Sequence, residues 1–302
     1  MSRIIVIGSS NTDMVIKSKK LPAPGETLLG GTFLMNPGGK GANQAVAAAR
    51  LGGNVTFVTK TGNDMFGAEA MQIFDNEGID TRFIIKDAEN PSGVALINVD
   101  ENGENSIVVA PGSNGSLSAY DIKDEVFETN TSDMFLMQLE IPVRTVEFVA
   151  QKAASNGNRV ILNPAPALQL SDDLLSCLYL VTPNETEAEL LTGIKVHDII
   201  SAEKAASKLR KKGVKNVIIT MGASGAYLLS GAISKMVPVI PVKAIDTTAA
   251  GDVFNGALAV AISEGKEIED AIVFANKAAS ISVTRMGAQA SAPYRNEVVL
   301  KW

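Results

Sequence analysis

The segment from Asp246 to Asp252, with the sequence DTTAAGD, has residue types that could bind a phosphate and move a proton. It follows an apolar, proline-containing run and precedes a stretch with helical periodicity, so its last residues are expected to form a first helical turn. The small residues Ala249, Ala250 and Gly251 would let a ligand approach the backbone N–H groups of that turn. These N–H groups lie at the positive end of the helix dipole, which makes the turn a candidate anion hole.

Asp252 is the leading candidate for a general base. An acidic residue in a first helical turn often only complements the helix dipole. Here, however, the carboxylate stands beside the candidate anion hole, and a second carboxylate, Asp246, precedes it in the same segment. The single histidine, His197, lies in a polar connection where exposure to solvent is expected. Acid–base chemistry therefore falls to a carboxylate, a lysine or a cysteine, and Asp252 is the best placed of these.

A second glycine-rich segment, from Pro37 to Gln44 with the sequence PGGKGANQ, also stands at the start of a helical pattern. It lacks the Gly-x-x-x-x-Gly-Lys-Ser/Thr spacing of a phosphate loop, which argues against a Walker-type nucleotide site. Its glycines would let a polar ligand rest against bare backbone. The Asn43 amide offers a donor and an acceptor to a hydroxyl group.

Three further segments follow expected strands. Asn11 and Asp13 suit the hydroxyl groups of a sugar, although a turn or helix-capping role fits them equally well. The carboxylates in 184–189, sequence NETEAE, would repel a bare phosphate, so a binding role there requires a bridging cation such as Mg²⁺ through water. The glycine-rich turn at 220–225 is a weak signal alone.

Short apolar runs alternate with helical periods along the chain, which predicts βαβ units in a three-layer α/β/α sandwich with a mainly parallel sheet. The expected strands are 4–8, 55–59, 135–139, 160–162, 180–182 and 217–220. The expected helices are 42–51, 68–77, 143–156, 185–191, 202–212, 251–264 and 268–284. We expect a single α/β domain over residues 1–302.

Two strand-like insertions, at about 15–34 and 93–112, interrupt this alternation. One interpretation is a pair of separate edge hairpins. The other is a small β-sheet that projects from the core and acts as a lid. The local pattern does not decide between them.

Composition narrows the classes of function. The 302 residues carry a formal net charge of −6 without a long run of Lys or Arg, which argues against a nucleic-acid partner. The single cysteine gives no sign of an oxidising compartment. The apolar run at the N-terminus is too short for a signal peptide, and no segment has the length of apolar sequence needed to cross a membrane. These features indicate a soluble, cytoplasmic protein with no membrane partner.

The segments 38–45 and 246–252 resemble the two signature regions of the ribokinase-like (PfkB) family of carbohydrate kinases, in the same order and at similar spacing. Supporting motifs occur at 11–13, 137–140, 163–166, 182–189 and 284–288, so the resemblance extends through the chain. It implies a core sheet of about nine strands. It also implies a β lid that commonly forms the contact of a homodimer.

The resemblance further implies site residues. The sugar would be bound by Asn11, Asp13, Gly39, Lys40, Asn43, Glu140 and Asp252. ATP would be bound by Asn184, Thr220, Gly222, Ser224, Gly225, Gly251 and Asn276, with Asn276 near the adenine. A monovalent cation, usually K⁺, would be held by Asp246, Thr248, Ser282, Arg285, Gly287 and Ser291, several through backbone carbonyls. Glu187 would serve Mg²⁺ through water, and Ala249, Ala250, Gly251 and Asp252 would be the catalytic group.

The expected activity is ATP-dependent phosphorylation of a pentose, D-ribose, at its 5-hydroxyl group. The alternatives are a related kinase acting on deoxyribose, a hexose or a nucleoside, and a sugar-binding regulator without catalysis. The low aromatic content of 5% argues against a nucleoside, because its base would need stacking partners. A nicotinamide oxidoreductase is disfavoured because no Gly-x-Gly-x-x-Gly follows the first strand.

Overall fold

The structure is a computed structural model that describes residues 2–300. Within this range, nine strands form one large sheet in the order β13-β12-β11-β10-β9-β8-β1-β4-β5. Their bounds are β1 Arg3–Ile7, β4 Asn54–Gly62, β5 Ile84–Asp87, β8 Met134–Met137, β9 Arg159–Leu162, β10 Leu180–Val181, β11 Asn216–Thr220, β12 Ala226–Ser230 and β13 Ile233–Val237. In this sheet the seven neighbouring strands β11, β10, β9, β8, β1, β4 and β5 are parallel, and β12 and β13 add an antiparallel edge.

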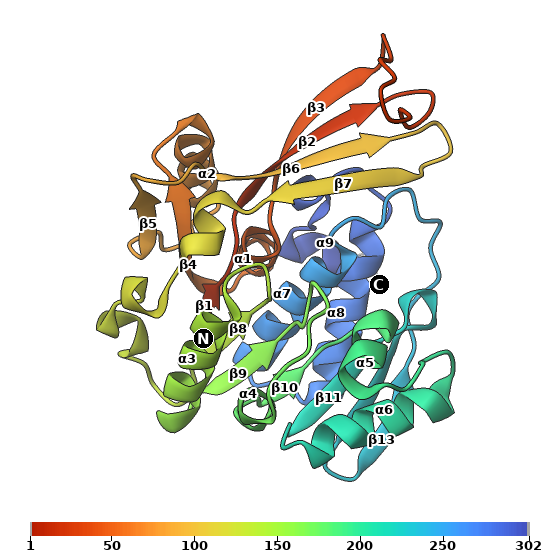
Figure 1. Ribbon diagram of the computed structural model, residues 1–302. Helices are drawn as coiled ribbons and strands as arrows, with labels where there is room; N and C mark the ends of the chain where they lie inside the picture. The colour runs from red at the N-terminus through yellow and green to blue at the C-terminus, as the bar shows by residue number, and fades with distance from the viewer. Residues whose placement is uncertain (1, 301–302) are drawn as a thin grey trace.

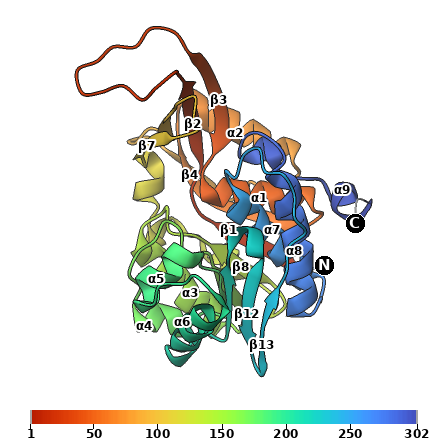
Figure 2. The same cartoon turned by 90° about the vertical axis from the view of Figure 1, so that its right-hand side faces the viewer.

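Helices cover both faces of this sheet, as the edge-on view in Figure 2 shows. Their bounds are α1 Lys40–Arg50, α2 Met65–Asn76, α3 Val143–Ser155, α4 Asp172–Ser176, α5 Glu185–Thr192, α6 Ile199–Lys211, α7 Ala250–Ser263, α8 Ile268–Ser282 and α9 Arg295–Leu300. The side chains of α1, α2, α7, α8 and α9 pack in the core on one face, and those of α3, α4, α5 and α6 on the other. The central strands are therefore buried on both faces, which explains their continuous apolar runs, such as residues 4–7 of β1.

Four further strands in the described part of the chain form a small sheet in the order β3-β2-β6-β7. They are β2 Asn11–Lys17, β3 Thr32–Gly38, β6 Gly93–Val99 and β7 Asn105–Ala110. The two insertions are joined because β2 pairs in parallel with β6. The small sheet projects from one end of the main body in both views (Figures 1 and 2). The two insertions therefore form a single projecting sheet and not separate edge hairpins.

The strand order reverses beside β1. From β1 the chain first adds β4 and β5 on one side and later adds β8 and β9 on the other. The loops that leave the carboxyl ends of β1 and β8 therefore diverge, and such a switch point is where open α/β sheets bind ligands. The segments that leave β1, β8 and β10 carry Ser9, Glu140 and Asn184, respectively.

The predicted fold class is confirmed, with adjustments at the element ends. Asn11 and Asp13 lie on β2, so the turn or helix-capping role that was one of the two alternatives for them is not the one they have. The strands β5, β12 and β13 were not expected from the pattern. No helix among residues 2–300 is long and apolar enough to cross a membrane.

Candidate active site

Four carboxylates and one lysine interact at the carboxyl edge of the large sheet. Lys40 is the first residue of α1, Asp13 lies on β2, Glu140 follows β8, Glu187 is in α5 and Asp252 is in α7. Burial alone would lower the pKa of Lys40, but these carboxylates outweigh it and raise the pKa. The fold therefore brings together charged residues that are far apart in the sequence, and Lys40 stays cationic among them.

Asp252 lies in the first turn of α7 with only 5% of its surface exposed. Its Oδ2 accepts a hydrogen bond from Nδ2 of Asn43 and its Oδ1 accepts one from Nε2 of Gln44, each at 2.9 Å. Burial raises the pKa of Asp252, while Lys40 and the two amide donors oppose the rise. A buried carboxylate with a raised pKa is suited to accept a proton from a ligand.

The glycine pair before α1 allows two chain segments to touch. Gly39 has φ of 88°, and a Cβ at this position would lie 2.7 Å from the backbone nitrogen of Asn11. Only glycine fits such a turn. The turn directs the N–H of Lys40 to Oε2 of Glu140 at 2.9 Å, and the same oxygen accepts a hydrogen bond from Oγ of Ser9 at 2.6 Å. The loop is thus fixed to the ends of β1 and β8.

Two polar groups in this region are suited to a ligand with hydroxyl groups. Burial, together with the charges of Glu140 and Asp252, raises the pKa of Asp13 to about 6. Oδ1 of Asn43 is buried and has no hydrogen-bond partner within the described residues. Because an unpaired buried acceptor is costly, a donor from a ligand would be stabilising there. Asn11 is oriented by Asn114, whose Nδ2 donates to Oδ1 of Asn11 at 2.7 Å.

The start of α7 has the geometry of an anion site. Ala249 is the one non-glycine residue with positive φ among residues 2–300, at 59°. This conformation costs an alanine about 1 kcal/mol and lets the helix begin at Ala250. The N–H groups of Gly251 and Asp252 belong to the first turn, which has no intrahelical acceptors to offer them. A Cβ at Gly251 would meet nothing within 4 Å, so this backbone faces open space.

A cavity of about 430 Å³ lies beside this turn. Of the residues predicted for ATP, its lining includes Asn184, Thr220, Gly222, Gly225, Gly251 and Asn276. Apolar residues complete the wall, namely Val239, Ile240, Pro241, Val242, Phe254 and Val283. Ser224 is part of the adjacent turn η4 (Gly222–Ser224) but not of the lining. The combination of an apolar wall with a few polar groups is typical of a site for a planar, partly polar ligand.

Asn184 and Glu187 form a capping box at the start of α5. Oδ1 of Asn184 accepts a hydrogen bond from the N–H of Glu187 at 2.8 Å, and Oε2 of Glu187 accepts one from the N–H of Asn184 at 2.9 Å. Burial raises the pKa of Glu187. Among residues 2–300, no group of three or more His, Cys, Asp or Glu residues could hold a metal ion. A divalent cation at Glu187 would therefore depend on water and ligand phosphates for its other ligands.

The residues predicted for a monovalent cation lie on connected loops. The carboxylate of Asp246 accepts hydrogen bonds from the N–H groups of Thr248 and Gly287, each at 2.9 Å. These bonds outweigh burial and lower the pKa of Asp246. The guanidinium of Arg285 binds Glu297, so Arg285 could serve a cation only through its carbonyl. Ser282 ends α8, and Ser291 ends η5 (Gln289–Ser291), where its Oγ donates to the carbonyl of Ala288.

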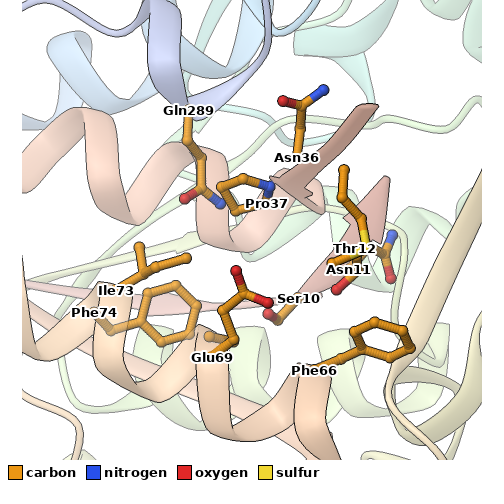
Figure 3. Close-up of a pocket in the computed structure, with 12 residues that line it drawn as sticks. Ser10, Asn11, Thr12, Asn36, Pro37, Phe66, Glu69, Ile73, Phe74 and Gln289 are labelled. Atoms are coloured by element: carbon orange, nitrogen blue, oxygen red, sulfur yellow. The ribbon is translucent and has the colours of Figure 1, made fainter. Parts of the chain in front are cut away.

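Two further hollows border the site. A groove of about 1110 Å³ separates the small sheet from the loop of Asp246 and includes Asp13 and Gly287 in its lining. A much smaller cavity, of about 30 Å³, lies on the α2 side of the β2–β3 pair and is lined by Asn11, Asn36, Glu69 and Gln289 among others (Figure 3). The small cavity includes no other residue predicted to bind the sugar. The groove is therefore the better route to Asp13.

Several site residues were missed in the sequence. Gln44 donates a hydrogen bond to Asp252, and Ser9 donates one to Glu140. Gln44 is in turn hydrogen-bonded to Gln138 and Asn163. A signal was present, because Gln138 is a polar residue directly after the buried apolar strand β8. The exposed histidine, His197, takes no part in the site.

The family description pfkB family carbohydrate kinase matches residues 1–295. This chain belongs to the pfkB family. The family match extends over both sheets and over every element that contributes to the site.

Individual pfkB relatives are similar over their whole length. A ribokinase from Haemophilus influenzae is 48% identical over 296 residues, which cover 98% of this chain and 97% of the relative. The crystal structure of a ribokinase from Thermotoga maritima has a TM-score of 0.91 and 42% identity, with 99% of each chain covered. The structure of an Arabidopsis thaliana ribokinase complexed with ribose and ATP has a TM-score of 0.93 and 33% identity, with 100% of each chain covered.

Proposed function

We propose that this pfkB kinase transfers the γ-phosphoryl group of ATP to the 5-hydroxyl group of D-ribose. The position of Asp252 carries the proposal. It adjoins the charged cluster around Lys40 on one side, and the first turn of α7 opens onto the cavity of about 430 Å³ on the other. The ribokinase relatives, one of them in complex with ribose and ATP, support ribose as the sugar.

The sugar would occupy the polar cluster. Asn11, Asp13, Gly39, Lys40, Asn43 and Glu140 supply the side-chain and backbone groups for its hydroxyls. Asp13 and the unpartnered Oδ1 of Asn43 offer acceptors, while the ammonium of Lys40 offers donors. An excess of carboxylates suits a neutral ligand rich in hydroxyl groups and repels a phosphate. The cluster therefore suits the sugar and not the nucleotide.

ATP would occupy the cavity beside α7. The apolar wall from Val239 to Val242 faces the space that a purine would fill, and Asn276 lies in the same lining. The ribose moiety and the phosphates of ATP would be held by Asn184, Thr220, Gly222, Ser224 and Gly225. The first turn of α7 would receive the γ-phosphate, because its N–H groups face open space at Gly251.

The reaction follows from these positions. The carboxylate of Asp252 accepts the proton of the sugar hydroxyl as the oxygen forms its bond to the γ-phosphorus and the bond to the leaving ADP oxygen breaks. The N–H groups at Gly251 and Asp252 stabilise the charge on the transferred group, and Ala249 fixes their direction. The N–H of Ala250 donates to the carbonyl of Thr247 and so holds the turn in place. In phosphoryl transfer, positioning and electrostatics supply most of the acceleration.

Two metal ions belong to the proposal. The carboxylate of Glu187 fits Mg²⁺ through water, and Mg²⁺ would neutralise charge on the ATP phosphates. The carboxylate of Asp246 and the carbonyls of the neighbouring loops would supply K⁺ with oxygen ligands. K⁺ would stabilise the loop from Asp246 to Asp252. Thr248, Ser282, Arg285, Gly287 and Ser291 are the proposed partners of Asp246.

The small sheet is proposed to act as a lid and as the contact of a homodimer. Its strands β6 and β7 expose Leu96 and Val108, which are paired across the strands on the face opposite to the groove-lining Ile97 and Ile107. Exposed apolar side chains that lie together in this way are typical of an interaction surface. Closure over the groove of about 1110 Å³ would exclude water, which competes with the sugar as phosphoryl acceptor. A cytoplasmic location, where ATP is abundant, completes the proposal.

The test is ADP release from MgATP with ribose, deoxyribose, fructose and adenosine in parallel, each with and without K⁺. We expect strong turnover with ribose that increases with K⁺. Preference for another sugar would keep the mechanism and overturn the choice of ribose. Absence of turnover with every sugar would favour a sugar-binding regulator.

A further inference from the structure

Three buried amide side chains connect Asp252 to the interior of the large sheet. Nε2 of Gln44 donates to Oδ1 of Asp252 at 2.9 Å and to Oδ1 of Asn163 at 3.1 Å. Oε1 of Gln44 accepts a hydrogen bond from Nε2 of Gln138 at 2.6 Å. Gln44 and Gln138 are fully buried, and Asn163 is 7% exposed. None of the three was assigned above to the sugar or the nucleotide.

The orientation of each amide is decided by its neighbours. An amide presents a donor and an acceptor of similar shape, so it can be turned by half a rotation. Nδ2 of Asn163 donates to the carbonyl of Thr182 at 3.3 Å, and a backbone carbonyl can only accept. Oδ1 of Asn163 must therefore face Gln44, whose NH₂ group then faces both Asn163 and Asp252. Oε1 of Gln44 is left to face Gln138.

This arrangement has a cost at its far end. Oε1 of Gln138 is buried without a hydrogen-bond partner within the described residues. An unpaired buried acceptor costs about 1–3 kcal/mol, which an apolar residue would avoid. We therefore expect the NH₂ group of Gln138 to make a contact that offsets this cost. That contact is its hydrogen bond to Oε1 of Gln44.

We propose that Gln44 is a positioning residue that distinguishes the two oxygens of Asp252. It holds Oδ1 as an acceptor, so that Oδ2 takes the proton of the sugar hydroxyl. A proton on Oδ1 would meet the N–H of Gln44, whose orientation is fixed by Asn163 and Gln138. Oδ2 accepts its hydrogen bond from Nδ2 of Asn43, but Oδ1 of Asn43 has no partner within the described residues, so this amide can turn and accept a proton from Oδ2. The inference rests on the proposed role of Asp252 as general base.

The proton balance follows directly. The O–H bond of the sugar breaks and the new O–H bond forms at Oδ2, while the sugar oxygen bonds to the γ-phosphorus and ADP leaves. The charged groups that face Asp252 are Lys40 of α1, Asp13 of β2, Glu140 after β8 and Glu187 of α5. They remain in every variant below, so a changed pH profile would report on the amides.

The main test is Gln44→Met, which keeps the approximate shape and removes both donors. We expect kcat to fall about 10- to 100-fold, because misplacing a reacting group is costly, while KM for ribose changes by less than about threefold. A donor that favours the ionised carboxylate is lost, so the acid limb of the kcat profile should move to higher pH, by roughly half a unit or more. A purely structural role would not move this limb.

Two further variants make the test independent of one substitution. Gln138→Met does not touch Asp252, but it removes the donor that holds Oε1 of Gln44. We expect a smaller shift in the same direction, and this variant serves if Gln44→Met does not fold. Gln44→Glu restores a donor to Oδ1 only while the new carboxyl is protonated. Its activity relative to Gln44→Met should therefore be higher at acid pH and decline as pH rises.

The matched control is Asn216→Leu. Asn216 is a buried amide, 8% exposed, at the start of β11, where it donates to the carbonyl of Tyr179 at 2.9 Å. It lies at the opposite edge of the sheet from Asp252, so its loss should lower stability and leave the acid limb unchanged. A wild-type kcat and an unmoved acid limb in folded Gln44→Met would overturn the positioning role if Asp252→Asn is inactive. An active Asp252→Asn would overturn the proposed base itself.

Discussion

Four carboxylates lie close together around Lys40, namely those of Asp13, Glu140, Glu187 and Asp252. Their burial disfavours the ionised form, whereas the charge of Lys40 favours it. Burial raises the pKa of Asp13, Glu187 and Asp252. Several carboxyl groups with perturbed pKa values in one place are typical of a functional site. Such a group can be relieved by a ligand that donates hydrogen bonds. A sugar does this, and a phosphate does not.

Asp13→Asn tests this environment through stability. The folded protein raises the pKa of Asp13 from 3.8 to about 6, so it binds a proton more tightly than the unfolded chain does. Wild-type stability should therefore decrease as pH rises from about 4 to about 6 and change no further above that range. The neutral asparagine avoids this loss of stability, which is on the order of 3 kcal/mol.

The measurement is the difference in Tm between Asp13→Asn and wild type across pH 4 to 8. We expect the difference to grow up to about pH 6 and then to level off, while ribose binding weakens. A difference that is the same at pH 4 and pH 8 would contradict a raised pKa for Asp13.

The sequence pointed to a site residue where that residue stands in a recognisable motif. Asp252 and Asn43 were predicted as site residues because glycines and small residues mark a backbone that a ligand can approach, whereas Lys40 was predicted from the family resemblance alone. Gln44, Gln138 and Asn163 were not, because they act through buried contacts between segments that are distant in sequence. Only the packing of α1 against α7 and the sheet brings these amides together.

At the scale of elements, α7 joins the two halves of the site. Its first turn faces the cavity proposed to bind ATP, while its buried middle packs on α1 and the large sheet. Two glycines on this one helix have different surroundings. A Cβ at Gly251 would enter open space, whereas a Cβ at Gly256 would lie 2.7 Å from the carbonyl oxygen of Gln44.

Gly251→Ala and Gly256→Ala should therefore have opposite effects. Gly251→Ala should keep or raise stability, by up to about 1 kcal/mol, because alanine favours a helix. It should lower kcat/KM for ATP by at least about tenfold, because the new methyl group would occupy the proposed phosphate position. Gly256→Ala should lower stability by about 1–3 kcal/mol because α1 and α7 must move apart.

Thermal unfolding and steady-state kinetics on both variants provide the check. If Gly251→Ala binds and uses ATP normally, the first turn of α7 is not the phosphate site. Gly256→Ala serves as the control for a change confined to helix packing.

Elements were predictable when their pattern was local. The buried strands β1, β4, β8, β9 and β11 and the helix α7 were expected within a few residues, because their apolar runs or periods are continuous. The edge strands β12 and β13 were missed, since an edge strand has a mixed and partly exposed pattern. The start of β2 at Asn11 was missed because its polar residues resemble a turn.

At the scale of the whole molecule, the two sheets border the proposed sugar site. The small sheet projects from one end of the main body (Figure 1). It stands across the groove of about 1110 Å³ from the loop of Asp246, and it exposes Leu96 and Val108 on its other face. The fold class followed from the alternation of strands and helices. The pairing of β2 with β6 did not, because a local pattern cannot specify a partner far along the chain.

Val108→Glu tests the proposed dimer. Val108 lies on β7 and is 65% exposed, so a charge there is harmless in a monomer and costly within an apolar interface. We expect wild type to have the mass of a dimer in light scattering at micromolar concentration, and Val108→Glu to shift toward the monomer.

Ile200→Glu is the matched control for this experiment. Ile200 lies on α6 and is 62% exposed, at a distance from the small sheet. It should leave the mass unchanged. A monomeric wild type, or a dimer that is unaffected by Val108→Glu, would contradict dimerisation through this face.

The most direct test of the account is the turnover of Asp252→Asn at saturating ribose and MgATP, with ribose binding measured by calorimetry. Asparagine keeps the shape of the side chain and cannot accept the proton. We predict that kcat falls on the order of 10²- to 10⁴-fold while the Kd for ribose stays within about threefold. Near-normal turnover by this variant would contradict the central claim that Asp252 is the base.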